Sequence, residues 1–240
     1  MHSTTSRRLR GVAVLLAGAL ALTACEDAPS GSAAASSARS SRPAVTTAAP
    51  PAATSRVEVA TVASATFSGA AVDQYGEDQV QAAYAVAAAF TDEVSFNESV
   101  LGPDPDRTVG AFEFATKYMT PKMAENWRAR MQKVLDGDME EAKNMMTFCY
   151  NDTLGPDMAF PSSGPIVKDR TISNAGSLID SRGRLIVTLD EHATMRYFRT
   201  GTLIDLAVDK TVSLSMVQQG DVWFIDSMSG EWHTGAEIPA

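Results

Sequence analysis

The sequence predicts an α+β domain in which N-terminal helices pack on a mostly antiparallel, four-stranded meander. The first observation is an apolar stripe with helical period between residues 77 and 94. The second is a change to alternating apolar and polar residues after Ile166, which is typical of half-buried strands. The third is that opposite charges face each other when these strands are folded into a hairpin. An apolar sheet face needs a cover, and the preceding helices are available for it.

The first predicted helix covers residues 77–94. Its inward stripe consists of apolar side chains spaced three or four residues apart, namely Val80, Tyr84, Ala87, Phe90 and Val94. Glycine and proline at positions 102–105 interrupt the chain after it. A second, short helix is expected over residues 109–118.

The third predicted helix has a clear start. Thr120 supplies a capping hydroxyl and Pro121 follows at the first helical position, where its missing N–H costs nothing. Gly137 can end this helix, and residues 138–146 can form another short one. Residues 151–165 are rich in glycine and proline and are expected to form a loop.

The first hairpin of the predicted sheet can be aligned residue by residue. A turn centred on Thr200 and Gly201 makes the numbers of facing residues add to 401. A four-residue loop over positions 199–202 would preserve the same alignment. The alignment places apolar residues opposite each other on one face: Leu185 and Met216, Val187 and Leu214, Leu189 and Val212, Ala193 and Val208, and Tyr197 and Ile204.

The charged residues of these two strands also fall into facing pairs. They are Glu191 with Lys210 on the apolar face, and His192 with Asp209 and Arg196 with Asp205 on the other face. Because a shift of one residue would mix the two faces, apolar burial favours this register.

A second hairpin is predicted with its turn at residues 219–220. Facing residue numbers then add to 439, so that Met216 faces Trp223 and Leu214 faces Ile225. Residues 180–184 are expected to form the turn before the first hairpin, with two possible parities of pairing.

The N-terminus has the pattern of a secretory signal. Three arginines, Arg7, Arg8 and Arg10, precede an apolar run over residues 11–22. This run is shorter than the approximately 20 residues that a membrane-spanning helix needs.

The run ends in Leu22-Thr23-Ala24-Cys25, which resembles the lipobox of bacterial lipoproteins. The resemblance implies that residues 1–24 are a signal peptide, and that diacylglyceryl and palmitate chains are attached to Cys25. Two acyl chains suffice for stable anchoring. We therefore expect a lipid-anchored protein on the extracytoplasmic face of the cell membrane, with an ordinary signal peptide as the alternative.

Residues 25–72 are predicted to be the lipidated cysteine and a disordered stalk. They are dominated by Ala, Ser, Thr and Pro, and they hold too few large apolar side chains to form a core. A flexible chain of this length spans roughly 40 Å. A short strand around residues 56–62 is the allowed exception, and the folded domain is expected to cover residues 73–240.

The charge and cysteine content exclude several functions. The chain carries a formal charge of −9, and loss of the signal would leave 17 basic and 29 acidic residues. Without a basic stripe, nucleic acid is a poor partner. Once Cys25 is lipidated, Cys149 has no disulfide partner and is expected to be a buried apolar residue. The two histidines beyond the signal have no zinc-site spacing, so neither a metal nor a cofactor is expected.

Helices followed by a meander, with Lys210-Thr211-Val212 and then Gly220-Asp221-Val222-Trp223-Phe224-Ile225-Asp226, resemble the NTF2-like α+β cone fold. The resemblance is greatest to extracytoplasmic domains of lipoproteins and transport-accessory proteins in high-GC Gram-positive bacteria. It implies a curved sheet that can enclose an apolar pocket, where enzymes of the superfamily place Asp or His acid–base groups.

The resemblance makes Glu191, Lys210, Tyr197 and Trp223 candidates to line such a pocket. The alternative for Glu191 and Lys210 is a structural ion pair, since buried charges normally require a partner. We expect no catalytic residue and prefer a non-catalytic binding or assembly module that acts on an envelope protein, for example in a transport complex. The alternatives are a carrier of a small apolar ligand and an acid–base enzyme that uses Glu191, or His192 with Asp209.

Overall fold

The protein is represented by a computed structural model that describes residues 55–101, 108–150 and 157–240. These residues form an α+β fold whose open sheet has the strand order β1-β3-β4-β5-β6, with β2 paired to β4. The strands are β1 (Thr61–Val62), β2 (Met158–Ala159), β3 (Val167–Ile179), β4 (Leu185–Arg199), β5 (Thr202–Gln219) and β6 (Val222–Pro239). The helices are α1 (Gly69–Tyr75), α2 (Glu77–Val94), α3 (Pro121–Leu135) and α4 (Met139–Met145), with 3-10 helices at Glu98–Val100 and Val109–Tyr118.

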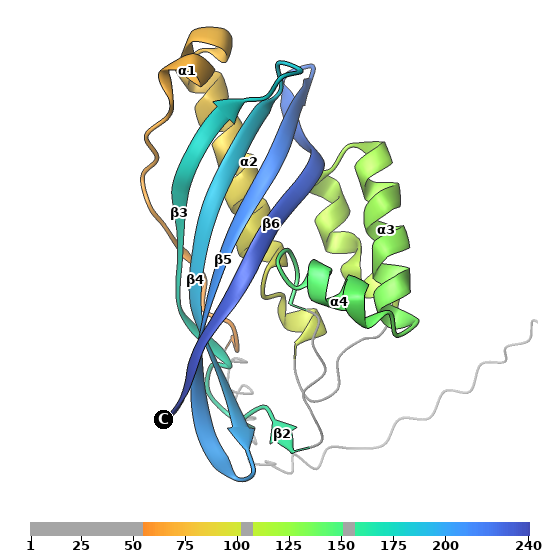
Figure 1. Cartoon of the computed structure of the whole chain (residues 1–240), viewed down its shortest axis with the longest axis vertical. Coiled ribbons are helices and arrows are strands. Elements are labelled where there is room, and N and C mark those ends of the chain that lie inside the picture. Colours follow the sequence, from red (N-terminus) through yellow and green to blue (C-terminus); the bar gives the residue numbers. More distant parts are fainter. Residues whose placement is uncertain (1–54, 102–107, 151–156) are drawn as a thin grey trace, which may run out of the picture. The chain divides into compact units, whose positions relative to one another are not determined.

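Among the described residues, the helices cover one face of the sheet. Figure 1 shows α2 running along the four long strands and α3 lying beyond the edge strand β6. The largest apolar cluster joins α2, the second 3-10 helix and α3 to the inner face of β3–β6, with Trp127 and Phe90 among its fully buried side chains. The predicted arrangement of helices on one face of an antiparallel meander is therefore confirmed, but the described residues form a sheet of six strands instead of four, because β1 joins it in parallel with β3 and β2 pairs with β4.

The helix limits follow the capping signals in the sequence. Helix α2 has the predicted bounds. The Thr120 hydroxyl accepts a hydrogen bond from the Met123 N–H at 3.2 Å, and Pro121 occupies the first turn of α3. Asp138 caps α4 in the same way through the Glu141 N–H at 3.0 Å. Residues 109–118 are helical as predicted, but they form a 3-10 helix.

The predicted register of the first hairpin is confirmed over its whole length, from Leu185 facing Met216 to Arg199 facing Thr202. The connection is a two-residue turn at Thr200 and Gly201, with φ angles of 50° and 79°. Two successive positive φ angles are typical of a type I′ turn, whose twist matches that of the strands. The four-residue loop is therefore excluded.

Thr200 is a poor residue for its turn. A β-branched side chain rarely adopts positive φ, whereas Asn tolerates this conformation. We expect Thr200→Asn to raise the free energy of unfolding by about 0.5–1 kcal/mol, measured by urea denaturation. The matched change Thr202→Asn, which lies in the strand, should give no gain because Asn disfavours strands. Equal effects of the two changes would contradict this interpretation.

The second hairpin differs from the prediction. Trp223 faces Gln218 and Ile225 faces Met216, so facing residue numbers add to 441 and the turn lies at Gly220 and Asp221. Gly220 has a φ of 63°, which suits the first central position of a type II′ turn. The shift is two residues, so Trp223 and Ile225 keep the buried face on which they were predicted.

The fold also begins earlier than predicted. Val57, Ala60 and Ala71 are buried, and β1 pairs in parallel with β3. The strand allowed around residues 56–62 is thus present, but the boundary at Asp73 falls inside α1. The alanine-rich composition concealed this segment, because small side chains pack closely without giving a strong apolar signal. Cys25 and the predicted signal peptide lie outside the described residues.

Candidate functional site

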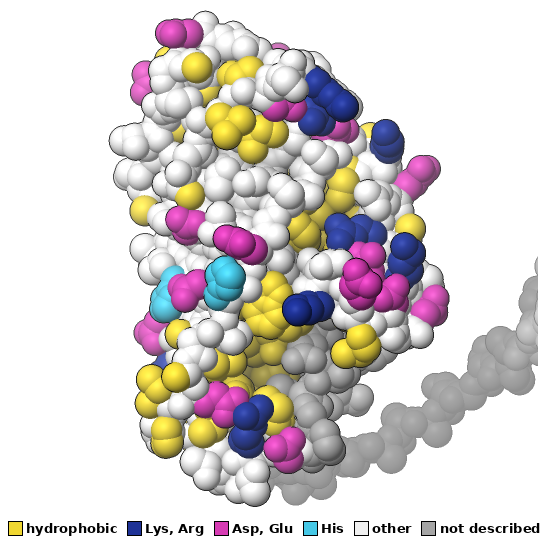
Figure 2. Space-filling view, in the orientation of Figure 1, with side chains coloured by type: hydrophobic (Ala, Val, Ile, Leu, Met, Phe, Trp, Pro, Cys, Tyr) yellow, Lys and Arg dark blue, Asp and Glu magenta, His cyan; other side chains and the backbone are white. Residues whose placement is uncertain are grey.

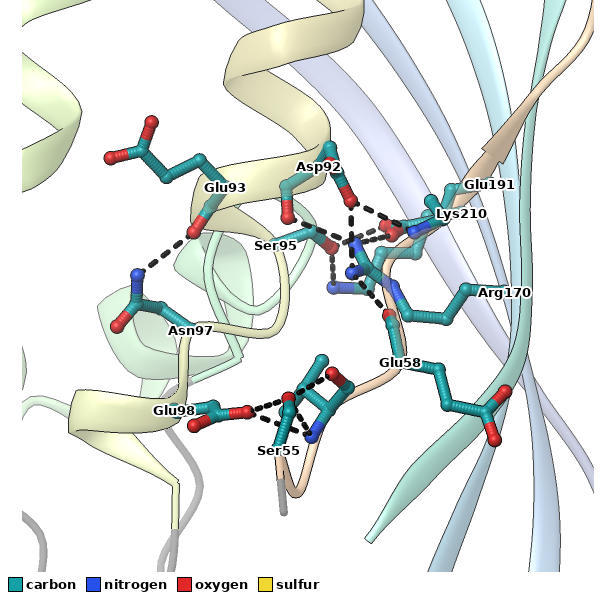
Figure 3. Close-up of polar contacts among 12 residues, drawn as sticks. Ser55, Glu58, Asp92, Glu93, Ser95, Asn97, Glu98, Arg170, Glu191 and Lys210 are labelled. Carbon is teal, nitrogen blue, oxygen red and sulfur yellow. Dashed lines mark hydrogen bonds and ion pairs between the residues drawn. The ribbon is translucent and has the colours of Figure 1, made fainter. Parts of the chain in front are cut away.

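The predicted inward pair of Glu191 and Lys210 lies in a buried ionic cluster. Both residues are 2% exposed. The Ser95 hydroxyl donates to Glu191 Oε2, and Lys210 Nζ donates to Ser95 Oγ at 2.7 Å. Arg170 donates to Glu191 Oε1 from Nη2 at 2.9 Å. Figure 3 shows these side chains pointing toward one another from the sheet and from the end of α2.

Arg170 connects the cluster to two further segments. Its Nη1 donates to the Glu58 carbonyl and to Asp92 Oδ1, each at 3.1 Å, and its Nη2 donates to the Asp92 carbonyl at 3.1 Å. Asp92 belongs to the last turn of α2, where carbonyl groups lack helical partners and the helix dipole is negative. The two cations of the cluster therefore lie where the helix end favours positive charge.

Burial changes the acid–base behaviour of this region. Removal of the Lys210 ammonium from water lowers its pKa to about 8, against the opposing effect of the nearby Glu191 carboxylate. The ammonium lies 4.1 Å from the centre of the Phe96 ring, which supplies a cation–π contact. Burial raises the pKa of the Cys149 thiol to about 12, so the thiol stays protonated at neutral pH. Cys149 is fully buried, as the sequence analysis predicted.

The cluster divides the core into two parts. On one side of the ionic cluster, Leu189 and Val212 belong to the largest apolar cluster, which packs against α2. On the other side, Ala193 and Val208 belong to a second apolar cluster. Its outer side underlies a hollow of about 260 Å³, where Arg170 and Asp92 contribute to the lining. Glu191 and Lys210 do not line that hollow. Ser95 and Arg170 contact Glu191, Ser95 also contacts Lys210, and both charged side chains are buried.

The other two candidate pocket residues are not brought to this place. Tyr197 belongs to the second apolar cluster, and its hydroxyl donates to Glu237 Oε1 at 2.7 Å. Trp223 belongs to the first, and its Nε1 donates to Gln79 Oε1 at 3.1 Å. Both are 2% exposed and serve as core residues in separate regions. The four candidates therefore do not form one pocket.

The pair of His192 and Asp209 lies on the outer face of the sheet, as predicted. His192 Nδ1 is 2.7 Å from Asp209 Oδ1, and both side chains are exposed. The structure adds His233, which faces Asp209 from β6, so that a histidine lies on each side of the carboxylate. The two histidine side chains are visible in Figure 2. Within the described ranges, no set of three or more His, Cys, Asp or Glu residues is arranged to hold a metal ion.

Accessible hollows occur instead along β6, where this edge strand faces α3 and α4. The first, here called the aromatic hollow, has a volume of about 380 Å³ and is lined by Arg130, Lys143, Asn144, Thr147, Phe148, Met228, Ser229, Gly230, Glu231 and Trp232. The second, here called the cationic hollow, has about 350 Å³ and is lined by Lys122, Met123, Asn126, Arg130, Arg182, Arg184, Asp226, Ser227 and Met228. The two share Arg130 and Met228, so they are adjacent. Figure 2 shows apolar side chains beside lysines and arginines in this region.

Sequence reasoning missed both the ionic partners and the hollows. Arg170 breaks the alternation of β3 because Asp169 adopts a φ of 55° at a bulge in the pairing with β4. Such a bulge turns the next side chain to the other face, and no glycine marks it in the sequence. The hollows combine residues more than 40 positions apart, so no local motif indicates them.

Comparisons with known proteins give no relative. No family model, no curated protein and no solved structure matches this chain. In the part of the chain that the structure describes, no helix is long and apolar enough to cross a membrane.

Proposed function

We propose that this chain is a lipoprotein anchored to the extracytoplasmic face of the cell membrane, and that its folded domain is a non-catalytic binding or assembly module of the envelope. The proposed anchor is Cys25, supported by the basic and apolar residues before it and by the block Leu22-Thr23-Ala24-Cys25. Helices that precede an antiparallel meander support an NTF2-like domain. A transport complex is one assembly that such a module can serve.

The main support for the proposal is the position of the accessible hollows along β6. The ionisable groups on the inner sheet face, Glu191 and Lys210, are closed against Ser95 and Arg170. The aromatic and cationic hollows both lie along the edge strand β6. An edge strand can pair with another chain, although the Ile225 carbonyl of β6 already accepts a hydrogen bond from the Thr120 N–H at 2.9 Å. Trp232, which is partly exposed, adds aromatic surface of the kind that is enriched at protein interfaces, whereas Phe148 is buried.

The closed inner face of the sheet favours this proposal over the two alternatives, an acid–base enzyme and a carrier of an apolar ligand. An acid–base enzyme that uses Glu191 would need substrate access to a side chain that is 2% exposed. One that uses His192 with Asp209 would have to act on the outer face of the sheet, because neither residue lines any of the three hollows described above. A carrier of an apolar ligand would need space on the inner face of the sheet, where Leu189, Val212 and Leu214 pack in one continuous cluster with the helices.

Photo-crosslinking in intact cells tests the proposal. A photoreactive amino acid at Ser229, in the aromatic hollow, should give a discrete adduct with an envelope protein. The matched position is Asp190, which is exposed on the outer sheet face and should give none. Adducts at both positions, or at neither, would argue against an assembly surface along β6.

The anchor is tested in the same cells. Cys25→Ser should abolish labelling of the chain by radioactive palmitate and should release the chain from the membrane, with loss of the Ser229 adduct. A wild-type chain that takes up no palmitate, or an adduct that persists in Cys25→Ser, would contradict the anchored part of the proposal.

A further inference from the structure

The cationic hollow concentrates positive charge on a chain that is acidic as a whole. Lys122 and Arg130 come from α3, and Arg182 and Arg184 come from the turn between β3 and β4. Asp226 is the single carboxylate among the lining residues. The net charge of the lining is therefore +3, whereas the whole chain has −9.

Part of this positive charge is already compensated. Arg130 Nε lies 2.6 Å from Glu141 Oε1. Arg184 Nε lies 2.8 Å from Asp180 Oδ2, and its Nη1 lies 3.3 Å from Asp226 Oδ2. These ion pairs hold the two guanidinium groups in place at the wall of the hollow.

The remaining two cations, Lys122 and Arg182, are exposed and have no carboxylate within ion-pair distance among the described residues. Lys122 is also in the first turn of α3, which contains no acidic residue. The helix dipole is positive there, so a lysine at this position is locally unfavourable. Local conflicts of this kind are expected where a residue serves a ligand, and a bound anion would remove the conflict.

We propose that the cationic hollow is a binding site for a phosphate group. Arginine guanidinium groups can each contact two phosphate oxygens, and Lys122 together with the start of α3 supplies further positive potential. A dianionic phosphate matches the uncompensated charges of Lys122 and Arg182 better than a single carboxylate. The group can belong to a soluble phosphate ester or to a lipid headgroup. Phosphate binding does not depend on the envelope partner proposed above, because it can be measured on the purified chain alone.

The test uses the full-length Cys25→Ser chain, so that acyl chains do not confuse membrane binding. Inorganic phosphate is titrated calorimetrically at constant ionic strength set with chloride. In parallel, the chain is sedimented with vesicles of phosphatidylcholine alone and of phosphatidylcholine with phosphatidylglycerol. Lys122→Gln and Arg182→Gln are compared with Lys133→Gln, an exposed lysine of α3 outside the hollow.

We expect phosphate binding that weakens about tenfold in Lys122→Gln and in Arg182→Gln and is unchanged in Lys133→Gln. If phosphate does not bind but the anionic vesicles do, with the same dependence on the variants, the ligand is a lipid headgroup. Absence of both kinds of binding would overturn the proposal, and so would equal weakening in all three variants. The replaced side chains are exposed, so the free energies of unfolding in urea should agree to within about 1 kcal/mol for all chains.

Discussion

Glu191→Gln should lower the free energy of unfolding by about 3–5 kcal/mol. The change keeps the size of the side chain but removes the negative charge between Arg170 and Lys210, which lie on opposite sides of it. Two cations would then share a buried site with Asp92 as the nearest remaining carboxylate. Urea denaturation followed by circular dichroism measures the loss.

Two comparisons identify the cause. Asp190→Asn removes a carboxylate from the adjacent, exposed position of β4 and should change stability by about 0.5 kcal/mol or less. Glu191→Gln combined with Lys210→Met removes both an anion and a cation, so it should recover part of the loss. If Glu191→Gln costs no more than Asp190→Asn, the cluster does not stabilise the fold as an ionic unit.

Gly230→Ala should be the most disruptive small substitution in β6. A methyl group at this position would lie 2.2 Å from the Thr211 carbonyl oxygen and 3.2 Å from the Val212 Cα. Both atoms belong to the backbone of β5, which cannot rotate away as a side chain would, so the two strands must separate locally. We expect a loss of about 3 kcal/mol in the free energy of unfolding, the upper end for overpacking.

The control for this change is Gly235→Ala on the same strand. Its methyl group would lie 3.3 Å from the Ala207 side chain, so the cost should stay below about 1 kcal/mol. Because Gly230 lines the aromatic hollow, its substitution should also reduce the Ser229 crosslink described above, whereas Gly235→Ala should preserve it. Equal stability of the two variants would show that β5 and β6 accommodate a side chain at position 230.

The two hairpins show how far a sequence pattern predicts strand pairing. For β4 and β5, apolar alternation and three charged pairs agree on one register, and the structure has that register. For β5 and β6 the alternation was weaker evidence, and the turn was placed at residues 219–220 instead of at Gly220 and Asp221. A two-residue slip leaves the apolar face unchanged, so burial alone cannot distinguish the alternatives. The pairing of Gln219 with Val222 in the structure decides between them.

The ionic cluster was predictable only in part. Glu191 facing Lys210 follows from the register, since both residues lie at apolar positions of their strands. Arg170 does not follow, because its inward direction depends on the bulge at Asp169. Ser95 could not be assigned either, because its contact with Lys210 depends on how α2 crosses the sheet. As a result the sequence predicted only the two facing charges of Glu191 and Lys210, whereas the structure contains a closed network that includes Arg170 and Ser95.

Local chemistry in the sequence determined that α2, α3 and α4 are helices and that β4, β5 and β6 are strands, where α3 begins, and which face of the sheet is apolar. These properties depend on residues close together in the chain, so caps and periodicity suffice to predict them. The tertiary structure alone decided that Tyr197 and Trp223 lie in separate clusters, and that Lys122 and Arg182 meet at one hollow. Such meetings depend on bulges and on the docking of α2 and α3, which arise from packing among distant residues and leave no local pattern.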